Sequence, residues 1–382
     1  MFRSLFTACL SIAYLFATAQ RIDSLPFNLN KGLQTVKGFI NESEAEFILD
    51  TGAGVTVTTN ATNEVASVKT LGKKIAIRDA NNETQKLRQV KIRQIKVGSF
   101  SVQDLQVVSF DMPYLDCQQL ILLGQDFMQK FNWKFDFDRQ VVYLSDIPFL
   151  PSEPMAKWDI NFVKNRPFVE FELENKKSKC LIDFGYRGYF DINASFSEID
   201  AVYKVKEREE KVIPYSAMVM GLATTKTEQP IHYILLDSIH FSNQPAYNIP
   251  VSVSNYTGAK IGIHYLTSFF SSLIINNSQR AMYYQEKVKP DYAQPGLDAG
   301  FTWKDGKLIV SDLNTGKASS DSMLKMGEEI KTIDGRTAAD FGTFCSVLTW
   351  RFGYTQPDVW IEKMDGTRIL IRRQSLLDFI KP

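Results

Sequence analysis

The chain has few histidines, few cysteines and almost no net charge. Its three histidines show no His-x-x-x-His spacing, which gives no basis for a zinc site. Its 44 lysines and arginines against 43 aspartates and glutamates leave a net charge of +1. That balance offers no electrostatic reason to expect nucleic acid or an anionic membrane as the main partner. The 44% hydrophobic and 23% charged residues are instead typical of a globular protein, and 382 residues suit two or three domains.

Long apolar runs are also missing, except for one at the N-terminus. Arg3 is the only charge before a run from Leu5 to Ala17, and Ala17-Thr18-Ala19 offers small residues for cleavage before Gln20. This pattern predicts a signal peptide over residues 1–19 and an exported protein, periplasmic or secreted. The alternatives are a membrane anchor, for which the run is short, and lipidation at Cys9, which lies early in the run. We expect no other membrane span.

Removal of such a leader leaves Cys117, Cys180 and Cys345. Three cysteines allow one disulfide bridge and leave at least one free thiol. Cys180 lies on an apolar strand, so we expect it to be a buried structural thiol rather than a nucleophile.

What the sequence does contain is an internal repeat. Asp50-Thr51-Gly52 ends the apolar run Phe47–Leu49, and Asp183-Phe184-Gly185 ends a second run at Ile182. An apolar segment with glycine follows each, at Leu122-Leu123-Gly124 and at Lys260-Ile261-Gly262. A strand pair with a polar turn follows each glycine in turn. The matched order predicts two similar lobes joined by the proline-containing stretch 145–155.

Most of the chain reads as short strands separated by turn residues. Residues 73–78 and 87–97 alternate apolar and polar side chains, as a hairpin does, and residues 211–236 hold the matching place in the second unit. After Pro290 a third segment lacks the Asp-Thr-Gly pattern and ends in a hairpin, 359–363 with 368–372, joined at Asp365-Gly366.

The runs Phe47–Ala53 and Ile121–Phe131 together resemble the retropepsin-like aspartic peptidases. In that family an Asp-Thr-Gly-Ala turn meets a later apolar-apolar-Gly segment, which here continues as Gly124-Gln125-Asp126-Phe127. The resemblance covers residues 25–147 well and residues 155–288 more weakly. It implies a mainly β fold, in which two retropepsin-like β-barrel lobes form a pepsin-like bilobal unit.

The resemblance also implies a chemistry. Asp50 and Asp183 would face each other and share a proton, because two close carboxylates cannot both ionise readily. The pair would activate a water molecule for peptide hydrolysis, with no cofactor and no metal. Thr51, Gly52 and Gly185 would support the two catalytic loops, and the two predicted hairpins would close over the substrate as flaps.

The second lobe departs from the family pattern. Phe184 stands where the family has threonine, so half of the hydroxyl lock between the lobes should be missing, and Tyr186 is bulky where a small residue is usual. His264 stands in the place of Asp126. Three interpretations stay open: an active enzyme using Asp50 and Asp183, a peptide-binding protein on a degenerate peptidase scaffold, and a dimer that pairs two first lobes.

The third segment resembles a PDZ domain over residues 293–382. Met323–Gly335 is similar to the family's Leu-x-x-Gly-Asp-x-Ile stretch, with Glu328 in place of the aspartate. The resemblance implies that Gly300, Phe301 and Thr302 bind the C-terminus of a peptide, which would add to the domain as a strand. The sequence therefore predicts a monomeric exported endopeptidase that acts on peptides or proteins and carries a C-terminal PDZ-like β-rich domain.

Overall fold

The computed structural model describes most of the chain after the predicted leader. The described residues are 20–79, 83–152, 154–173, 175–193, 213–220, 225–254, 258–292, 296–297, 299–314, 324–354 and 356–374. The predicted signal peptide, residues 1–19, lies outside them. Within the described part of the chain, no helix is long and apolar enough to cross a membrane.

The first lobe is built on a seven-stranded sheet. Its order is β2 (Thr35–Ile40), β3 (Ser43–Leu49), β8 (Leu120–Leu123), β4 (Val57–Thr58), β7 (Phe100–Ser109), β6 (Thr84–Val97) and β5 (Lys69–Arg78). A further pairing joins β2 to β6, which curls the sheet back on itself. Three short helices accompany it: α1 (Asn60–Val65), α2 (Pro113–Gln118) and α3 (Gln125–Met128).

The two lobes share a six-stranded sheet, to which each contributes three strands. Its order is β1 (Ile22–Pro26), β10 (Val141–Ser145), β9 (Asn132–Asp136), β20 (Phe270–Asn276), β21 (Ala281–Glu286) and β11 (Ala156–Asp159). The lobes meet where β9 pairs with β20, with Phe135 opposite Leu273. Both side chains are fully buried in a core that continues from one lobe into the other.

The second lobe repeats the plan of the first. Its strands are β12 (Asn161–Val163), β13 (Arg166–Leu173), β14 (Lys176–Ile182), β15 (Phe190–Asn193), β16 (Ile213–Met220), β17 (Thr225–Phe241), β18 (Gln244–Ser254) and β19 (Lys260–Ile261). Helix α5 (Ile263–Phe269) follows β19, as α3 follows β8, and the short turn η3 (Asn277–Gln279) lies between β20 and β21.

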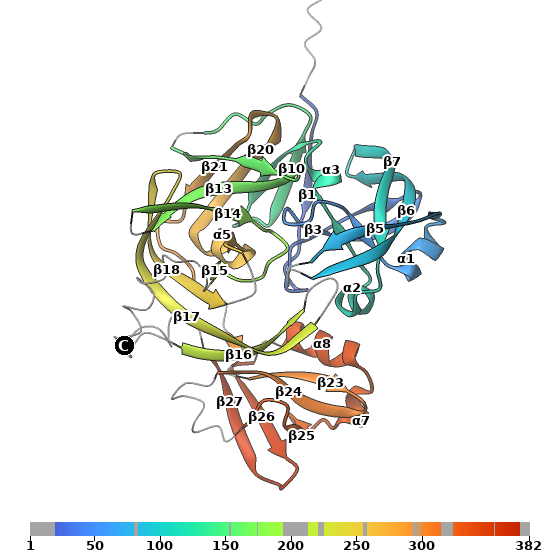
Figure 1. Cartoon of the computed structure of the whole chain (residues 1–382), viewed down its shortest axis with the longest axis vertical. Coiled ribbons are helices and arrows are strands. Elements are labelled where there is room, and N and C mark those ends of the chain that lie inside the picture. The colour runs from blue at the N-terminus through green and yellow to red at the C-terminus, as the bar shows by residue number, and fades with distance from the viewer. Residues whose placement is uncertain are drawn as a thin grey trace, which may run out of the picture.

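A C-terminal domain follows with its own hydrophobic core. It holds β22 (Gly296–Leu297), β23 (Ala299–Lys304), β24 (Lys307–Asn314), β25 (Glu329–Ile333), α7 (Ala338–Phe341), α8 (Phe344–Gly353), β26 (Asp358–Lys363) and β27 (Arg368–Gln374). Figure 1 shows this domain below the two lobes, with β16 and β17 running between them. The predicted fold, mainly β with two lobes and an additional C-terminal β-rich domain, is confirmed.

Candidate active site

Asp50 lies at the end of β3, directly after the buried residues Phe47, Ile48 and Leu49. The strand is apolar because both of its faces are covered where it pairs in parallel with β8. The Asp50 amide donates to the carbonyl of Leu123 at 3.0 Å, and the Ala53 amide donates to Asp50 Oδ1 at 2.9 Å. The turn therefore holds the carboxylate in one orientation.

Asp183 is placed in the same way in the second lobe. It follows β14, which pairs in parallel with β19, and its amide donates to the carbonyl of Ile261 at 2.8 Å. The Tyr186 amide donates back to the Asp183 carbonyl at 3.2 Å and closes the turn. The sequence repeat thus corresponds to a repeat in structure.

The two turns bring the two carboxyl groups together. Asp50 and Asp183 lie within hydrogen-bonding reach of each other. A Cβ atom on Gly52 would overlap the Asp183 carboxylate, and one on Gly185 would overlap the Asp50 carboxylate. Glycine is required at both positions because each carboxylate lies directly against the backbone of the opposite turn.

The pKa values of the pair follow from this arrangement. Desolvation raises the pKa of Asp50 to about 8, with the Asp183 charge adding to the shift. Desolvation also raises the pKa of Asp183, but the positive charges of Lys260 and Arg166 and the Gly185 amide oppose it. We infer that Asp183 ionises first while Asp50 keeps the shared proton, which provides one acid and one base in a single site.

One threonine connects the two turns. Thr51 Oγ1 donates to the carbonyl of Ile182 at 2.6 Å and accepts from the Phe184 amide at 3.0 Å. Phe184 has no hydroxyl with which to make the reciprocal hydrogen bond. Its ring is fully buried and lies 4.8 Å from the ring of Phe135, centroid to centroid. The second half of the predicted lock is therefore replaced by aromatic packing.

The glycine segments behind the aspartates differ between the lobes. In the first, Asp126 accepts from the amide of Thr56 at 2.9 Å and from its hydroxyl at 2.6 Å, which anchors the turn after Asp50. In the second, desolvation lowers the pKa of His264 to about 3, so this imidazole is neutral. It is half-buried and packs edge-on against Tyr189.

A buried lysine near Asp183 has no counterpart in the first lobe. Lys260 is 9% exposed and occupies the place that Leu122 holds in the first unit. Its Nζ lies 3.9 Å from Asp191 Oδ2 and 4.0 Å from the centre of the Tyr186 ring. Ser252 Oγ donates to Asp191 Oδ1 at 2.8 Å. Sequence reasoning missed this cluster, although a lysine within an otherwise apolar strand is a signal for it.

The two predicted flaps are present as hairpins, but they have different neighbours. The first is formed by β5 and β6, and β5 is the last strand of its sheet. In the second, β16 pairs on one side with β17 and on the other with β24, where Ser216 lies opposite Leu313. The C-terminal domain thus carries the second hairpin as an added strand (Figure 1).

The predicted peptide-binding residues lie on β23. Phe301 is buried in the core of the C-terminal domain, and Thr302 is half-buried opposite Ile309. The backbone of Gly300 lies against the carboxylate of Asp312, which pairs with Arg351 of α8 at 2.8 Å. In the described sheet, β23 pairs only with β24, and α8 lies against β23.

A disulfide bridge joins the C-terminal domain to the first lobe. It connects Cys117 in α2 with Cys345 in α8, 228 residues apart, while Cys180 is a buried free thiol as predicted. The ring of Tyr114 packs edge-on against Phe352 at 5.7 Å, and Leu348 belongs to the apolar cluster of the first lobe. Helix α8 therefore packs both against the core of the C-terminal domain and against the apolar cluster of the first lobe.

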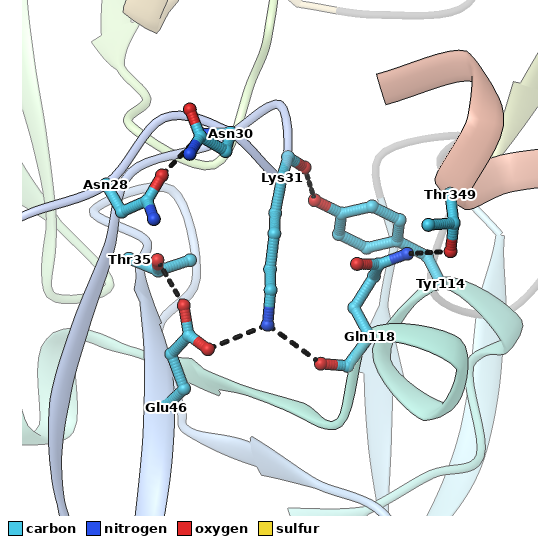
Figure 2. A network of polar contacts seen from close by, with 8 residues as sticks. All are labelled: Asn28, Asn30, Lys31, Thr35, Glu46, Tyr114, Gln118 and Thr349. Carbon is cyan, nitrogen blue, oxygen red and sulfur yellow. Dashed lines mark hydrogen bonds and ion pairs between the residues drawn. The ribbon is translucent and has the colours of Figure 1, made fainter. Parts of the chain in front are cut away.

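Polar contacts hold α2 in place beneath α8, as Figure 2 shows. Lys31 Nζ donates to Glu46 Oε2 at 2.7 Å and to the Gln118 carbonyl at 3.1 Å. The Tyr114 hydroxyl donates to the Lys31 carbonyl, and Gln118 Nε2 reaches Thr349 Oγ1 of α8 at 3.3 Å.

Among the described residues, no three His, Cys, Asp or Glu side chains gather in a way that could hold a metal ion. The chemistry available at Asp50 and Asp183 is that of two carboxyl groups.

Residues 36–130, which include Asp50 and the segment up to Gly124, match the family model described as gag-polyprotein putative aspartyl protease. The match covers the turn that carries Asp50 and does not extend to the second lobe or the C-terminal domain. No curated protein matches the sequence. Among solved structures, an aspartic proteinase from Irpex lacteus is similar at a TM-score of 0.44 and 10% identity, covering 70% of this chain and 98% of that one.

A second similar structure is a retropepsin-like aspartic protease from Rickettsia conorii. It has a TM-score of 0.26 and 17% identity, covering 33% of this chain and 93% of that one. Neither likeness assigns a role to any residue of this chain.

Proposed function

We propose that the protein is an aspartic endopeptidase in which Asp50 and Asp183 of one chain activate a water molecule. The observation that supports it most is the reciprocal packing of each carboxylate against the glycine of the opposite turn. Two desolvated carboxyls in contact share a proton, and a family match covers the turn that carries the first of them.

The reaction divides into two roles. Asp183, as the ionised partner, takes a proton from the attacking water, while Asp50, as the protonated partner, donates to the oxygen of the peptide carbonyl. The C–N bond of the tetrahedral intermediate then breaks as the amine nitrogen receives the proton that Asp183 took. One hydroxyl of the intermediate returns its proton to Asp50, which leaves a carboxylic acid and an amine as products. The hairpin β5–β6 is the candidate cover that orients the peptide.

The second candidate is a peptide-binding protein that does not catalyse. The observation that favours it is the one-sided lock, since Phe184 supplies no hydroxyl to the first lobe. Under this alternative the protein still binds extended peptides but hydrolyses none.

The experiment is to incubate the full chain with a library of unstructured peptides over a range of pH and to identify new termini by mass spectrometry. We expect cleavage by the wild type and none by Asp50→Asn, a nearly isosteric change that removes the ionisable group. Peptides that bind to both proteins and are cleaved by neither would favour the binding-only alternative. Equal cleavage by both proteins would place the chemistry elsewhere.

Two further parts of the proposal concern export and recognition. The leader pattern supports cleavage before Gln20, and N-terminal sequencing of the protein from its host tests it, with an intact Met1 as the contrary result. A PDZ-like role of the C-terminal domain is supported by β23, which has β24 as its one partner among the described strands, and by α8, which lies against it. Peptides with a free C-terminal carboxylate should bind Asp50→Asn more tightly than their amidated forms, and equal binding would contradict that role.

A further inference from the structure

The hairpin β5–β6 is strongly positive, although the whole chain is almost neutral. Residues 69–97 contain nine lysines and arginines and two acidic residues, Asp79 and Glu83, which gives a local net charge of +7 (9 − 2) in a protein of net charge +1. A surface this strongly charged concentrates ligands of the opposite charge.

The charges are arranged in a way that costs stability. Lys74 lies directly opposite Arg88 on the neighbouring strand, and Lys69 lies opposite Lys91. Like charges directly opposite each other in an antiparallel pair destabilise it. Asp104 partly offsets the second pair, at 2.7 Å from Lys91 Nζ, but no acidic partner within the described residues neutralises Lys74. An anionic ligand bound beside the pair would relieve this repulsion.

The basic side chains share one exposed face of the hairpin. Ile75 and Leu87 lie opposite each other and pack toward the apolar cluster of the first lobe. Because successive side chains of a strand alternate between faces, Lys74, Lys86 and Arg88 point to the other side, and all three are exposed.

The same hairpin offers a free backbone edge. β5 ends its sheet, and its outer edge has no strand partner among the described elements. Lysines on an edge strand also protect it from aggregation, but Lys86 and Arg88 lie on β6, an inner strand that needs no such protection. Their charge therefore calls for a different reason.

We propose that the edge of β5 binds an extended acidic polypeptide segment as an added strand, with carboxylates at alternate positions facing Lys74, Lys86 and Arg88. Lys86 and Arg88 are two residues apart on β6, about 7 Å along the strand, which is also the spacing of alternate residues in an added strand, and Lys74 lies opposite Arg88 on β5. The peptide backbone would bond to β5, and the basic face would select its charge.

The composition of the hairpin favours a polypeptide over nucleic acid. Residues 69–97 contain no Phe, Tyr or Trp, so the face has no ring on which a base could stack. The idea that the bound segment is a substrate rests on the proposed peptidase function. Its binding to β5 does not depend on that function.

The test measures binding without catalysis. A fluorescent peptide that alternates Glu and Val is titrated into full-length Asp50→Asn, and the anisotropy is compared with that of a matched peptide with Gln in place of Glu. We expect the Glu peptide to bind at least about tenfold more tightly at low salt, and the preference to shrink as salt rises toward roughly 0.5 M. Equal binding of the two peptides would overturn the proposal.

Variants locate the site. Lys74→Glu with Arg88→Glu, made in the Asp50→Asn protein, should abolish the preference, and Lys74→Gln with Arg88→Gln should reduce it. Lys130→Glu with Lys289→Glu is the matched control, since both lysines are exposed and lie outside the hairpin. Circular dichroism checks the fold of each.

Three further outcomes are informative. A preference that survives the change at Lys74 and Arg88 would overturn the proposal, as would a single-stranded oligonucleotide that displaces the Glu peptide at lower concentration than the unlabelled peptide does. Binding of the Glu peptide by Asp50→Asn, combined with no peptide cleavage by the wild type, would support this site. That result would contradict only the proposed peptidase function.

Discussion

Thr51 connects the Asp50 turn to the Asp183 turn by hydrogen bonds on both sides of its hydroxyl. It donates to the carbonyl of Ile182 and accepts from the amide of Phe184, while Phe184 contributes a buried ring in return. The two lobes are therefore aligned by one polar lock and one apolar contact. Together with the pairing of β9 and β20, these contacts hold Asp50 opposite Asp183.

Thr51→Val should weaken both the fold and the activity. The change leaves the Ile182 carbonyl and the Phe184 amide buried without a partner, which costs about 1–3 kcal/mol for each unsatisfied group. Urea unfolding measures the loss, and peptide cleavage measures the effect on the aspartate pair. The control for stability is Thr70→Val, at an exposed position in β5, which should leave the unfolding midpoint unchanged. An unfolding midpoint of Thr51→Val equal to that of the wild type would contradict a stabilising role of the Thr51 hydrogen bonds.

Stability should depend on pH through Asp50. The pKa of Asp50 is raised to about 8 in the folded protein, whereas an aspartate in an unfolded chain titrates near about 3.9. Between these values the folded state holds a proton that the unfolded state has lost, so the unfolding free energy falls as the pH rises. Asp50→Asn should therefore gain stability relative to the wild type from pH 4.5 to pH 8. Urea unfolding at both pH values checks this, and a constant difference would contradict it.

Lys260 should set the acid limb of the activity profile. Desolvation raises the pKa of Asp183, and the positive charge of Lys260 opposes that rise. Lys260→Met should therefore raise this pKa further and shift the acid limb of the pH–activity profile to higher pH. Lys260→Arg keeps the charge and should keep the limb in place. Lys307→Met, at an exposed lysine, is the control for loss of a lysine elsewhere. An unshifted limb in Lys260→Met would show that Lys260 only supports Asp191.

The bridge between Cys117 and Cys345 should stabilise the attachment of the C-terminal domain to the first lobe. Its removal in Cys117→Ser should cost about 2–5 kcal/mol, the range for loss of a native disulfide. Unfolding without reductant measures the difference. Adding dithiothreitol should bring the wild type to the level of the variant and leave the variant unchanged. A wild type that is insensitive to the reductant would contradict a stabilising role.

The sequence predicted those features that depend on local pattern. An apolar strand that ends in Asp and a turn with Gly identified both aspartates and the substitution at Phe184. The pairing of Cys117 with Cys345 could not be predicted, because three cysteines leave the choice open and the two lie 228 residues apart. The pairing of β16 with β24 was missed because strand addition uses backbone edges, which side chains do not mark.

Cleavage of a peptide substrate by Asp183→Asn tests the central claim most directly, because the claim requires the degenerate second lobe to supply one of the two carboxyls. We expect Asp183→Asn to remain folded by circular dichroism and to show no hydrolysis at any pH, as Asp50→Asn should. Hydrolysis at the wild-type rate by Asp183→Asn, together with its loss in Asp50→Asn, would contradict the account and favour a dimer of first lobes.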